Sequence, residues 1–156
     1  MNTQNINILL ADDDEADCLL FKEALEALPV STHLTVVHNG EQVIEELTKE
    51  KNKPPDVLFL DLNMPRKSGF ATLGAIKRNT ALQDIPVIII STTSEVESVK
   101  RVFRDAAHYY ICKPADFTHL KKVIYEALSL ITLENRPLLP LEENFMITGT
   151  SIIIPE

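Results

Sequence analysis

The chain has 156 residues, of which 45% are hydrophobic and 24% are charged, a composition typical of a globular protein. Its 23 acidic and 15 basic side chains give a net charge of -8, which argues against non-specific binding to nucleic acid or to anionic membrane surfaces. No apolar run reaches the roughly 18 residues of a membrane-spanning helix, and two cysteines without metal-like spacing, Cys18 and Cys112, favour a reducing, cytoplasmic setting.

Short apolar runs alternate with amphipathic segments along the first 131 residues. The apolar runs predict strands at 6–10, 34–37, 57–60, 87–90 and 109–112. The amphipathic segments predict helices at 15–28, 41–49, 71–77, 95–107 and 116–131. The apolar side of the first helix is expected at Leu20, Ala24 and Leu28, and that of the fourth at Val96, Val99, Val102 and Phe103.

Five strand–helix units in succession predict an α/β fold, a doubly wound parallel sheet with helices on both faces. Right-handed crossovers place the carboxyl ends of the strands on one edge of this sheet. Polar residues end or follow four of the strands, namely Asp12, Asp13, Asp61, Ser91 and Lys113. Open α/β sheets bind their ligands at this edge, so we expect a functional site there.

Asp61 is the centre of the expected site. It follows the apolar run 57–60, which has the pattern of a strand buried on both faces of a parallel sheet. The carboxylates of Asp12 and Asp13 would repel that of Asp61 and raise the carboxyl pKa values unless a cation lay between them. Taken alone, the acidic run 12–15 could be charge at a helix start. Together with Asp61 it predicts a cation site with Asp61 as nucleophile.

Four motifs resemble the receiver domain of two-component response regulators, including the single-domain chemotaxis type, in order and at the family's spacing. They are LLADDD at 9–14, FLDLNMPRKSGF at 59–70, IIIST at 88–92 and YYICKP at 109–114. The resemblance implies a flavodoxin-like sheet with the strand order 2-1-3-4-5. It also implies a receiver domain at 1–131 and a C-terminal extension, without an output domain, at 132–156.

The resemblance implies a signalling protein that catalyses only its own phosphotransfer and dephosphorylation. Asp61 would take a phosphoryl group from a sensor histidine kinase or a phosphotransfer protein, and the chain would then signal to a downstream protein through a changed binding surface. Mg²⁺ would offset the repulsion between carboxylate and phosphoryl group. Its ligands would be Asp13, Asp61 and the backbone carbonyl of Asn63, with Asp12 acting mainly through water.

Three further residues complete the set that the resemblance implies. Lys113 would pair with Asp61 or with phosphoryl oxygens, and Ser91 would donate its hydroxyl to a phosphoryl oxygen. Tyr110 would turn inward as Ser91 moves, although a tyrosine in such a strand is more often a core residue than a switch. The Lys113–Pro114 bond is expected to be cis, against the base rate for such bonds, because the lysine must turn back toward Asp61.

Two other functions compete with this one. A Mg²⁺-dependent phosphatase of the haloacid dehalogenase type would use the same aspartate as nucleophile, but it needs a second aspartate two residues later as general acid. This chain has Asn63 at that position. A scaffold that has lost the phosphorylation chemistry is disfavoured, because the aspartates, the serine and the lysine of the site are all present.

Residues 135–156 lie beyond the last predicted helix. Their three prolines argue against one long helix, and they carry no basic patch, so they form no DNA-binding output domain. Apolar groups such as Phe145 and the run 152–154 predict that the segment packs on something. Because five helices would already cover the receiver domain, we expect the extension to cross to a second copy and form a homodimer, rather than fold back on its own domain.

Overall fold

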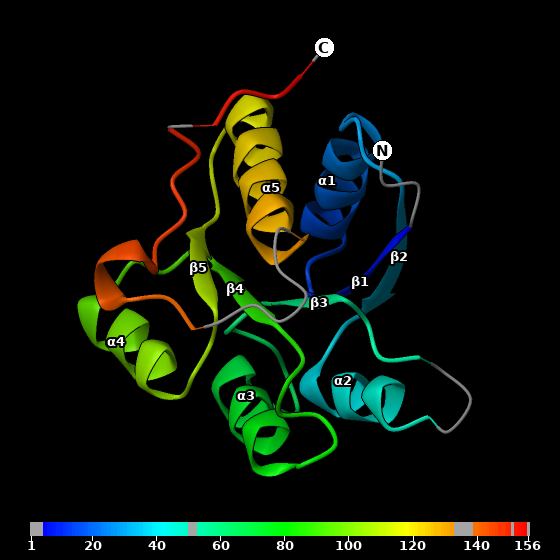
Figure 1. Ribbon diagram of the computed structural model, residues 1–156. Coiled ribbons are helices and arrows are strands. Elements are labelled where there is room, and N and C mark those ends of the chain that lie inside the picture. The colour runs from blue at the N-terminus through cyan, green and yellow to red at the C-terminus, as the bar shows by residue number, and fades with distance from the viewer. Residues whose placement is uncertain (1–4, 50–52, 133–138, 151, 156) are drawn as a thin grey trace.

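Five parallel strands form one sheet in the described part of the computed structural model, residues 5–49, 53–132, 139–150 and 152–155 (Figure 1). The strands are β1 Ile6–Ala11, β2 Thr32–Val37, β3 Val57–Leu60, β4 Val87–Ser91 and β5 Tyr109–Cys112. The helices are α1 Glu15–Glu26, α2 Gly40–Leu47, α3 Gly69–Arg78, α4 Val96–Arg104, α5 Phe117–Thr132 and the short 3-10 helix η1 Glu142–Asn144. The strand order β2-β1-β3-β4-β5 confirms the predicted fold class.

Helices cover both faces of the sheet. α1 and α5 lie on one face, and α2, α3 and α4 lie on the other (Figure 1). Alternate residues of a strand point to opposite faces. Phe59 therefore packs against Phe21 of α1, with ring centroids 4.9 Å apart, while its neighbour Leu58 joins the core on the face covered by α2, α3 and α4. Because β3 and β4 are buried on both faces, their sequences are apolar without alternation. Among the described helices, none has both the length and the apolar character needed to cross a bilayer.

The buried face of α1 differs from the predicted one. Its buried residues are Cys18, Phe21, Ala24 and Leu25. Leu20, which was expected to be buried, is exposed. Ala24 and Leu28 are buried as predicted. Leu20 is turned by about 100° from its buried neighbour Phe21 on a helix of 3.6 residues per turn, which takes it off the buried face. Val96, at the first turn of α4, is likewise exposed rather than buried.

The C-terminal extension folds back onto its own domain. Phe145–Ile147 runs parallel to β5, because the Tyr110 N–H donates to Phe145 O at 3.0 Å and the Ile147 N–H donates to Tyr110 O at 2.9 Å. Phe145 is 1% exposed and meets Phe103 of α4 edge-on, with ring centroids 5.1 Å apart. In Figure 1 the orange and red segment passes α4 and β5 and continues beside α5.

The described extension also contacts α5. The Gly149 N–H donates to Glu126 Oε1 at 3.0 Å, and Gly149 has a φ of 74°, a conformation that glycine adopts without strain. The premise of the predicted homodimer is therefore wrong: the domain core does use the extension, since Phe145 joins the core on one face of the sheet and Ile147 joins it on the other. Of the predicted extension, residues 133–138, 151 and 156 lie outside the described residues.

Candidate functional site

Backbone pairing brings the predicted site residues to one edge of the sheet. Asp61 follows β3, and its N–H donates to Ala11 O at 3.0 Å, which places Asp61 beside Asp12 at the end of β1. Lys113 follows β5, and its N–H donates to the carbonyl of Ser91, the last residue of β4, at 2.7 Å. Parallel pairing thus aligns the ends of β1, β3, β4 and β5, four neighbouring strands of the sheet, as expected from the sequence.

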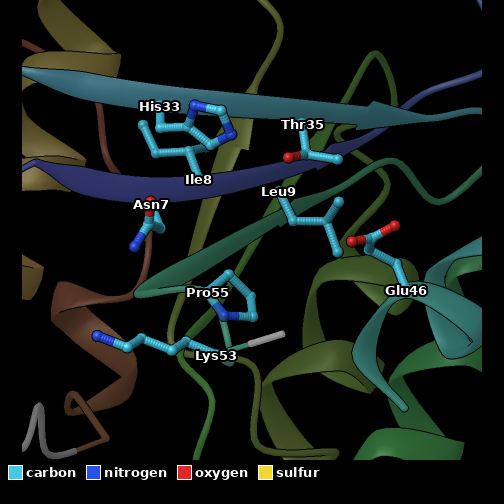
Figure 2. Close-up of a pocket in the computed structure, with 8 residues that line it drawn as sticks. All are labelled: Asn7, Ile8, Leu9, His33, Thr35, Glu46, Lys53 and Pro55. Carbon is cyan, nitrogen blue, oxygen red and sulfur yellow. The ribbon is translucent and has the colours of Figure 1, made fainter. Parts of the chain in front are cut away.

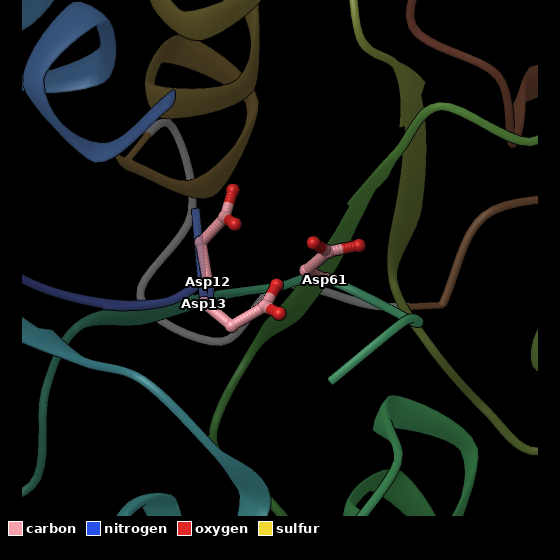
Figure 3. A group of neighbouring side chains, drawn as sticks. All are labelled: Asp12, Asp13 and Asp61. Atoms are coloured by element: carbon pink, nitrogen blue, oxygen red, sulfur yellow. The ribbon is translucent and has the colours of Figure 1, made fainter. Parts of the chain in front are cut away.

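Three carboxylates form a cluster at this edge. Asp12, Asp13 and Asp61 offer oxygen atoms that all lie within 4.8 Å of one another (Figure 3). Asp12 and Asp61 are buried and Asp13 is exposed, so the cluster opens to solvent on the side of Asp13. Hard carboxylate oxygens at this spacing fit Mg²⁺ or a similar divalent cation. The Asn63 N–H donates to Asp61 Oδ1 at 3.3 Å, which places its backbone beside the cluster; the predicted role of its carbonyl as a ligand stays a prediction.

Lys113 reaches the cluster from the end of β5. Its ammonium nitrogen lies 2.8 Å from Asp12 Oδ2, 2.8 Å from Asp17 Oδ2 and 3.3 Å from Asp61 Oδ2. The predicted pairing with Asp61 is present, but it is the longest of the three. Asp17 was missed from the sequence, because an acidic residue in the first turn of a helix is usually explained by the helix dipole alone.

Burial and charge act against each other in this cluster. Burial raises the pKa of Asp61 to about 6, with the positive charge of Lys113 opposing the rise and the negative charge of Asp12 adding to it. Burial alone would lower the pKa of Lys113, but its hydrogen bonds to Asp12 and Asp17 and the charge of Asp61 raise it above its ordinary value. At neutral pH, Asp61 is therefore ionised and Lys113 is protonated.

Ser91 and Tyr110 connect this edge to the core. Ser91 is fully buried, and its hydroxyl accepts from the Thr93 N–H at 3.3 Å. Burial raises the pKa of Tyr110, and the Ser91 hydroxyl partly offsets that rise. The Tyr110 hydroxyl donates to Thr93 O at 2.6 Å, and its side chain is already fully buried. Tyr110 is thus already turned inward in this structure, where Phe145 covers its ring with ring centroids 6.2 Å apart, and its predicted movement with Ser91 on phosphorylation stays a prediction.

The Lys113–Pro114 peptide bond is trans, since the structure contains no cis peptide bond in the residues described. The prediction of a cis bond was wrong because it assumed that the backbone must reverse to bring the lysine back. The long side chain of Lys113 reaches the carboxylates of Asp12, Asp17 and Asp61 without that reversal.

Gly69 lets the loop after β3 close tightly on the site. The Gly69 N–H donates to Leu62 O at 3.0 Å. A Cβ atom at Gly69 would lie 2.2 Å from the backbone oxygen of Asp61, which is too close for any side chain. The start of α3 therefore packs directly against the backbone of the central aspartate.

The described pockets lie away from the carboxylates. One, of about 240 Å³, opens near the amino end of β1 (Figure 2) and is lined by Asn7, Ile8, Leu9, His33, Thr35, Glu46, Lys53 and Pro55. A second, of about 310 Å³, separates α4 from the extension and is lined by Ser94, Val96, Val99, Lys100, Phe103, Glu142, Phe145 and Met146. None of the clustered carboxylates lines either of these two pockets.

Known proteins match this sequence across most of its length. A sequence model of the response regulator receiver domain matches residues 8–125. Response regulator Rcp1 of Synechocystis sp. is 30% identical over 121 residues, which cover 75% of this chain and 82% of that protein. The probable methanogenesis regulatory protein FilR2 of Methanothrix harundinacea is 28% identical over 122 residues, covering 76% of this chain and 79% of that protein.

Solved structures agree with the sequence match. The phosphorylated cyanobacterial phytochrome response regulator RcpA superposes with a TM-score of 0.78 at 27% identity, over 86% of this chain and 100% of that one. The Mn²⁺-bound form of Rcp1 gives a TM-score of 0.73 at 28% identity, over 87% of this chain and 99% of that one. The family match covers more than half of the chain and includes the carboxylate cluster and Lys113. The chain therefore belongs to the response regulator receiver domains of two-component systems.

Proposed function

We propose that this protein is a phosphoacceptor switch of a two-component phosphorelay, which takes a phosphoryl group from a sensor histidine kinase or a phosphotransfer protein onto Asp61. One observation carries the proposal: a buried carboxylate at the end of the central strand lies among two further carboxylates and 3.3 Å from a lysine ammonium. The phosphorylated state of RcpA and the Mn²⁺ in Rcp1 belong to those proteins, and they support the same chemistry here.

The proposed reaction is an in-line displacement at phosphorus. An oxygen of the ionised Asp61 carboxylate forms the new O–P bond while the bond from phosphorus to the donor histidine nitrogen breaks. The donor imidazole retains the electron pair of the broken bond and takes up a proton from solvent. Mg²⁺, held by Asp12, Asp13 and Asp61 with the Asn63 carbonyl, would supply positive charge against the phosphoryl oxygens. Lys113 donates to a phosphoryl oxygen, and Ser91 donates its hydroxyl to another.

The phosphorylated protein would signal through the surface around α4, β5 and α5. Ser91 is joined to that surface through Thr93 and the buried Tyr110, whose ring contacts Phe145. A shift of Ser91 toward a phosphoryl group would therefore disturb the docking of the extension. The partner would be a downstream protein rather than DNA.

We also propose a cytoplasmic location, which is consistent with the two free cysteines. A further proposed partner is a second copy of the chain. The extension exposes Leu139, Leu141 and Ile153 even though Phe145 is buried within its own domain. These exposed apolar side chains are what a homodimer would cover. Light scattering on the full chain tests this point, and a monomer at high concentration contradicts it.

Phosphorylation is tested with acetyl phosphate and Mg²⁺, followed by intact mass spectrometry. We expect one added phosphoryl group on the full chain, and none on Asp61→Asn or in excess chelator. Asp56→Asn is the matched control, because Asp56 lies just before the other end of β3 and binds the Asn7 N–H at 2.8 Å. Equal labelling of the Asp61→Asn protein, or full labelling in chelator, contradicts the proposal. The competing phosphatase function predicts release of inorganic phosphate from many substrates. It would require Asn63 to act as a general acid, and an amide side chain does not do so.

A further inference from the structure

Asp17 binds the lysine of the site but stands apart from the clustered carboxylates. Its Oδ2 atom lies 2.8 Å from Lys113 Nζ, as close as Asp12 Oδ2 and closer than Asp61 Oδ2. Asp12 and Asp61 directly follow strands β1 and β3, whereas Asp17 lies in the first turn of α1. The oxygens that could hold a metal ion come from Asp12, Asp13 and Asp61, and Asp17 is not one of them.

The number of donors on an ammonium group makes this arrangement informative. Lys113 has three N–H donors, and three carboxylate oxygens accept from it, one each from Asp12, Asp17 and Asp61. A metal ion and an incoming phosphoryl group would both draw on the oxygens of Asp12 and Asp61. Asp17 alone of the three can keep its hydrogen bond to Lys113 while the other two change partners.

The backbone fixes Asp17 for this role. The Asp17 N–H donates to Asp14 Oδ1 at 3.0 Å, so the residue that caps α1 also orients the turn that carries Asp17. The Asp17 side chain is 37% exposed, whereas the Lys113 side chain is 14% exposed. The lysine is thus largely enclosed, and Asp17 is the more solvent-exposed member of the pair and lies outside the group of oxygens that could hold a metal ion.

We propose that Asp17 is a positioning residue that holds the Lys113 ammonium beside Asp61 throughout the phosphorylation reaction. It keeps one donor occupied and leaves another directed at the position of the phosphoryl oxygens, so that the lysine needs little reorientation in the transition state. The inference rests on the proposed phosphorylation of Asp61, and it adds a residue that the reaction has not been assigned.

Nuclear magnetic resonance of the Lys113 ammonium tests the anchor without any phosphorylation. A hydrogen-bonded, enclosed ammonium exchanges its protons slowly enough to give a ¹H–¹⁵N signal, so we expect this signal in the wild-type protein with and without Mg²⁺. Asp17→Ala should lose the signal when Mg²⁺ is present, and Asp17→Glu should restore it. Glu15→Gln is the matched control, because it removes the same charge from the same turn of α1 and should leave the signal unchanged.

The rate of labelling by acetyl phosphate at saturating Mg²⁺ tests the effect on the reaction. We expect Asp17→Ala to slow it by about tenfold, the scale of one charge-assisted hydrogen bond, with recovery in Asp17→Glu and no change in Glu15→Gln. A purely structural ion pair predicts that Asp17→Glu and Asp17→Ala behave alike. An unchanged ammonium signal in Asp17→Ala, or a lost signal with an unchanged rate, overturns the proposal. Should the wild-type chain take up no phosphoryl group, the proposed function fails, and the resonance result still decides the anchor.

Discussion

The carboxyl edge of the sheet and the C-terminal extension are both connected to Tyr110, but different kinds of side chain are buried in the two regions. The edge gathers charged groups, since Asp12 and Asp61 are buried and both accept from Lys113. The extension gathers apolar groups, of which Phe145 is buried against β5 and α4. Burying a charge costs free energy even when it is paired, whereas burying apolar surface stabilises the fold. Opposite changes in stability should therefore follow from mutations in the two regions.

The largest expected effect is at Phe145. Asp61 can be neutralised without leaving a cavity, but Phe145→Ala removes a ring that is 1% exposed and packed between Phe103 and Tyr110. We expect the free energy of unfolding to fall by about 3–5 kcal/mol, as for other buried phenylalanines. Urea denaturation measures it. Met146→Ala is the control, because its side chain is 39% exposed and its loss should cost about 1 kcal/mol. Equal losses in the two variants would mean that the extension does not dock as described.

A change in the free energy of unfolding of the opposite sign is expected at the carboxyl edge of the sheet. Asp61→Asn should raise the free energy of unfolding by about 3 kcal/mol at neutral pH in chelator, because each pKa unit corresponds to roughly 1.4 kcal/mol and burial raises the pKa of Asp61 from 3.8 to about 6. The raised pKa means that the folded wild-type protein binds a proton more tightly than the unfolded chain. The contribution of Asp61 to stability is therefore largest below pH 3.8 and is lost as the pH rises through about 6.

The pH dependence identifies the cause of that gain. The difference between Asp61→Asn and wild type should be small near pH 4, grow up to about pH 6 and then level off. Saturating Mg²⁺ should shrink the difference, because a bound cation stabilises the wild-type carboxylates. Asp56→Asn, before the other end of β3, should show neither trend. A variant that is less stable than wild type in chelator at neutral pH would show that the pairing with Lys113 outweighs the burial of the charge.

The smallest effect is expected where the two regions meet. Tyr110→Phe removes the hydroxyl that donates to Thr93 O at 2.6 Å but keeps the ring against Phe145. We expect a loss of about 1 kcal/mol, the net value of one hydrogen bond. A double-mutant cycle with Phe145→Ala then measures whether the residues are coupled. Additive losses would mean that Tyr110 and the extension are energetically independent, and a coupling energy of about 0.5 kcal/mol or more would mean that they are coupled. Tyr125→Phe, on α5, is the matched hydroxyl deletion outside this chain of contacts.

The predicted positions of Asp12, Asp61, Ser91 and Lys113 were confirmed at one edge because their placement depends on two simple properties. Apolar runs of strand length end just before or at these residues, and parallel strands bring their carboxyl ends together. Neither property requires knowledge of side-chain packing. Asp17 was missed because it is on a helix, and its approach to Lys113 depends on how α1 packs over the sheet.

The errors in the sequence analysis have a shared origin. Leu20 was placed on the buried face by its spacing from Ala24, and the Lys113–Pro114 bond was expected to reverse the chain. Each error concerns the space around a side chain. That space is set by neighbours far away in the sequence, such as Phe145, which lies 35 residues after Tyr110 and covers its ring.

The sequence by itself determined the fold class, the strand order through the family resemblance, and the carboxylates with their lysine, because short-range patterns and chain topology are sufficient for those. Its apolar composition also required the extension to be buried somewhere. Only the tertiary structure decided that β5 and α4 of the same chain receive Phe145, and that Asp17 completes the hydrogen bonds of Lys113. Hydrophobic burial has no preferred direction, and a long lysine can reach several acids, so packing alone selects among the partners that the sequence allows.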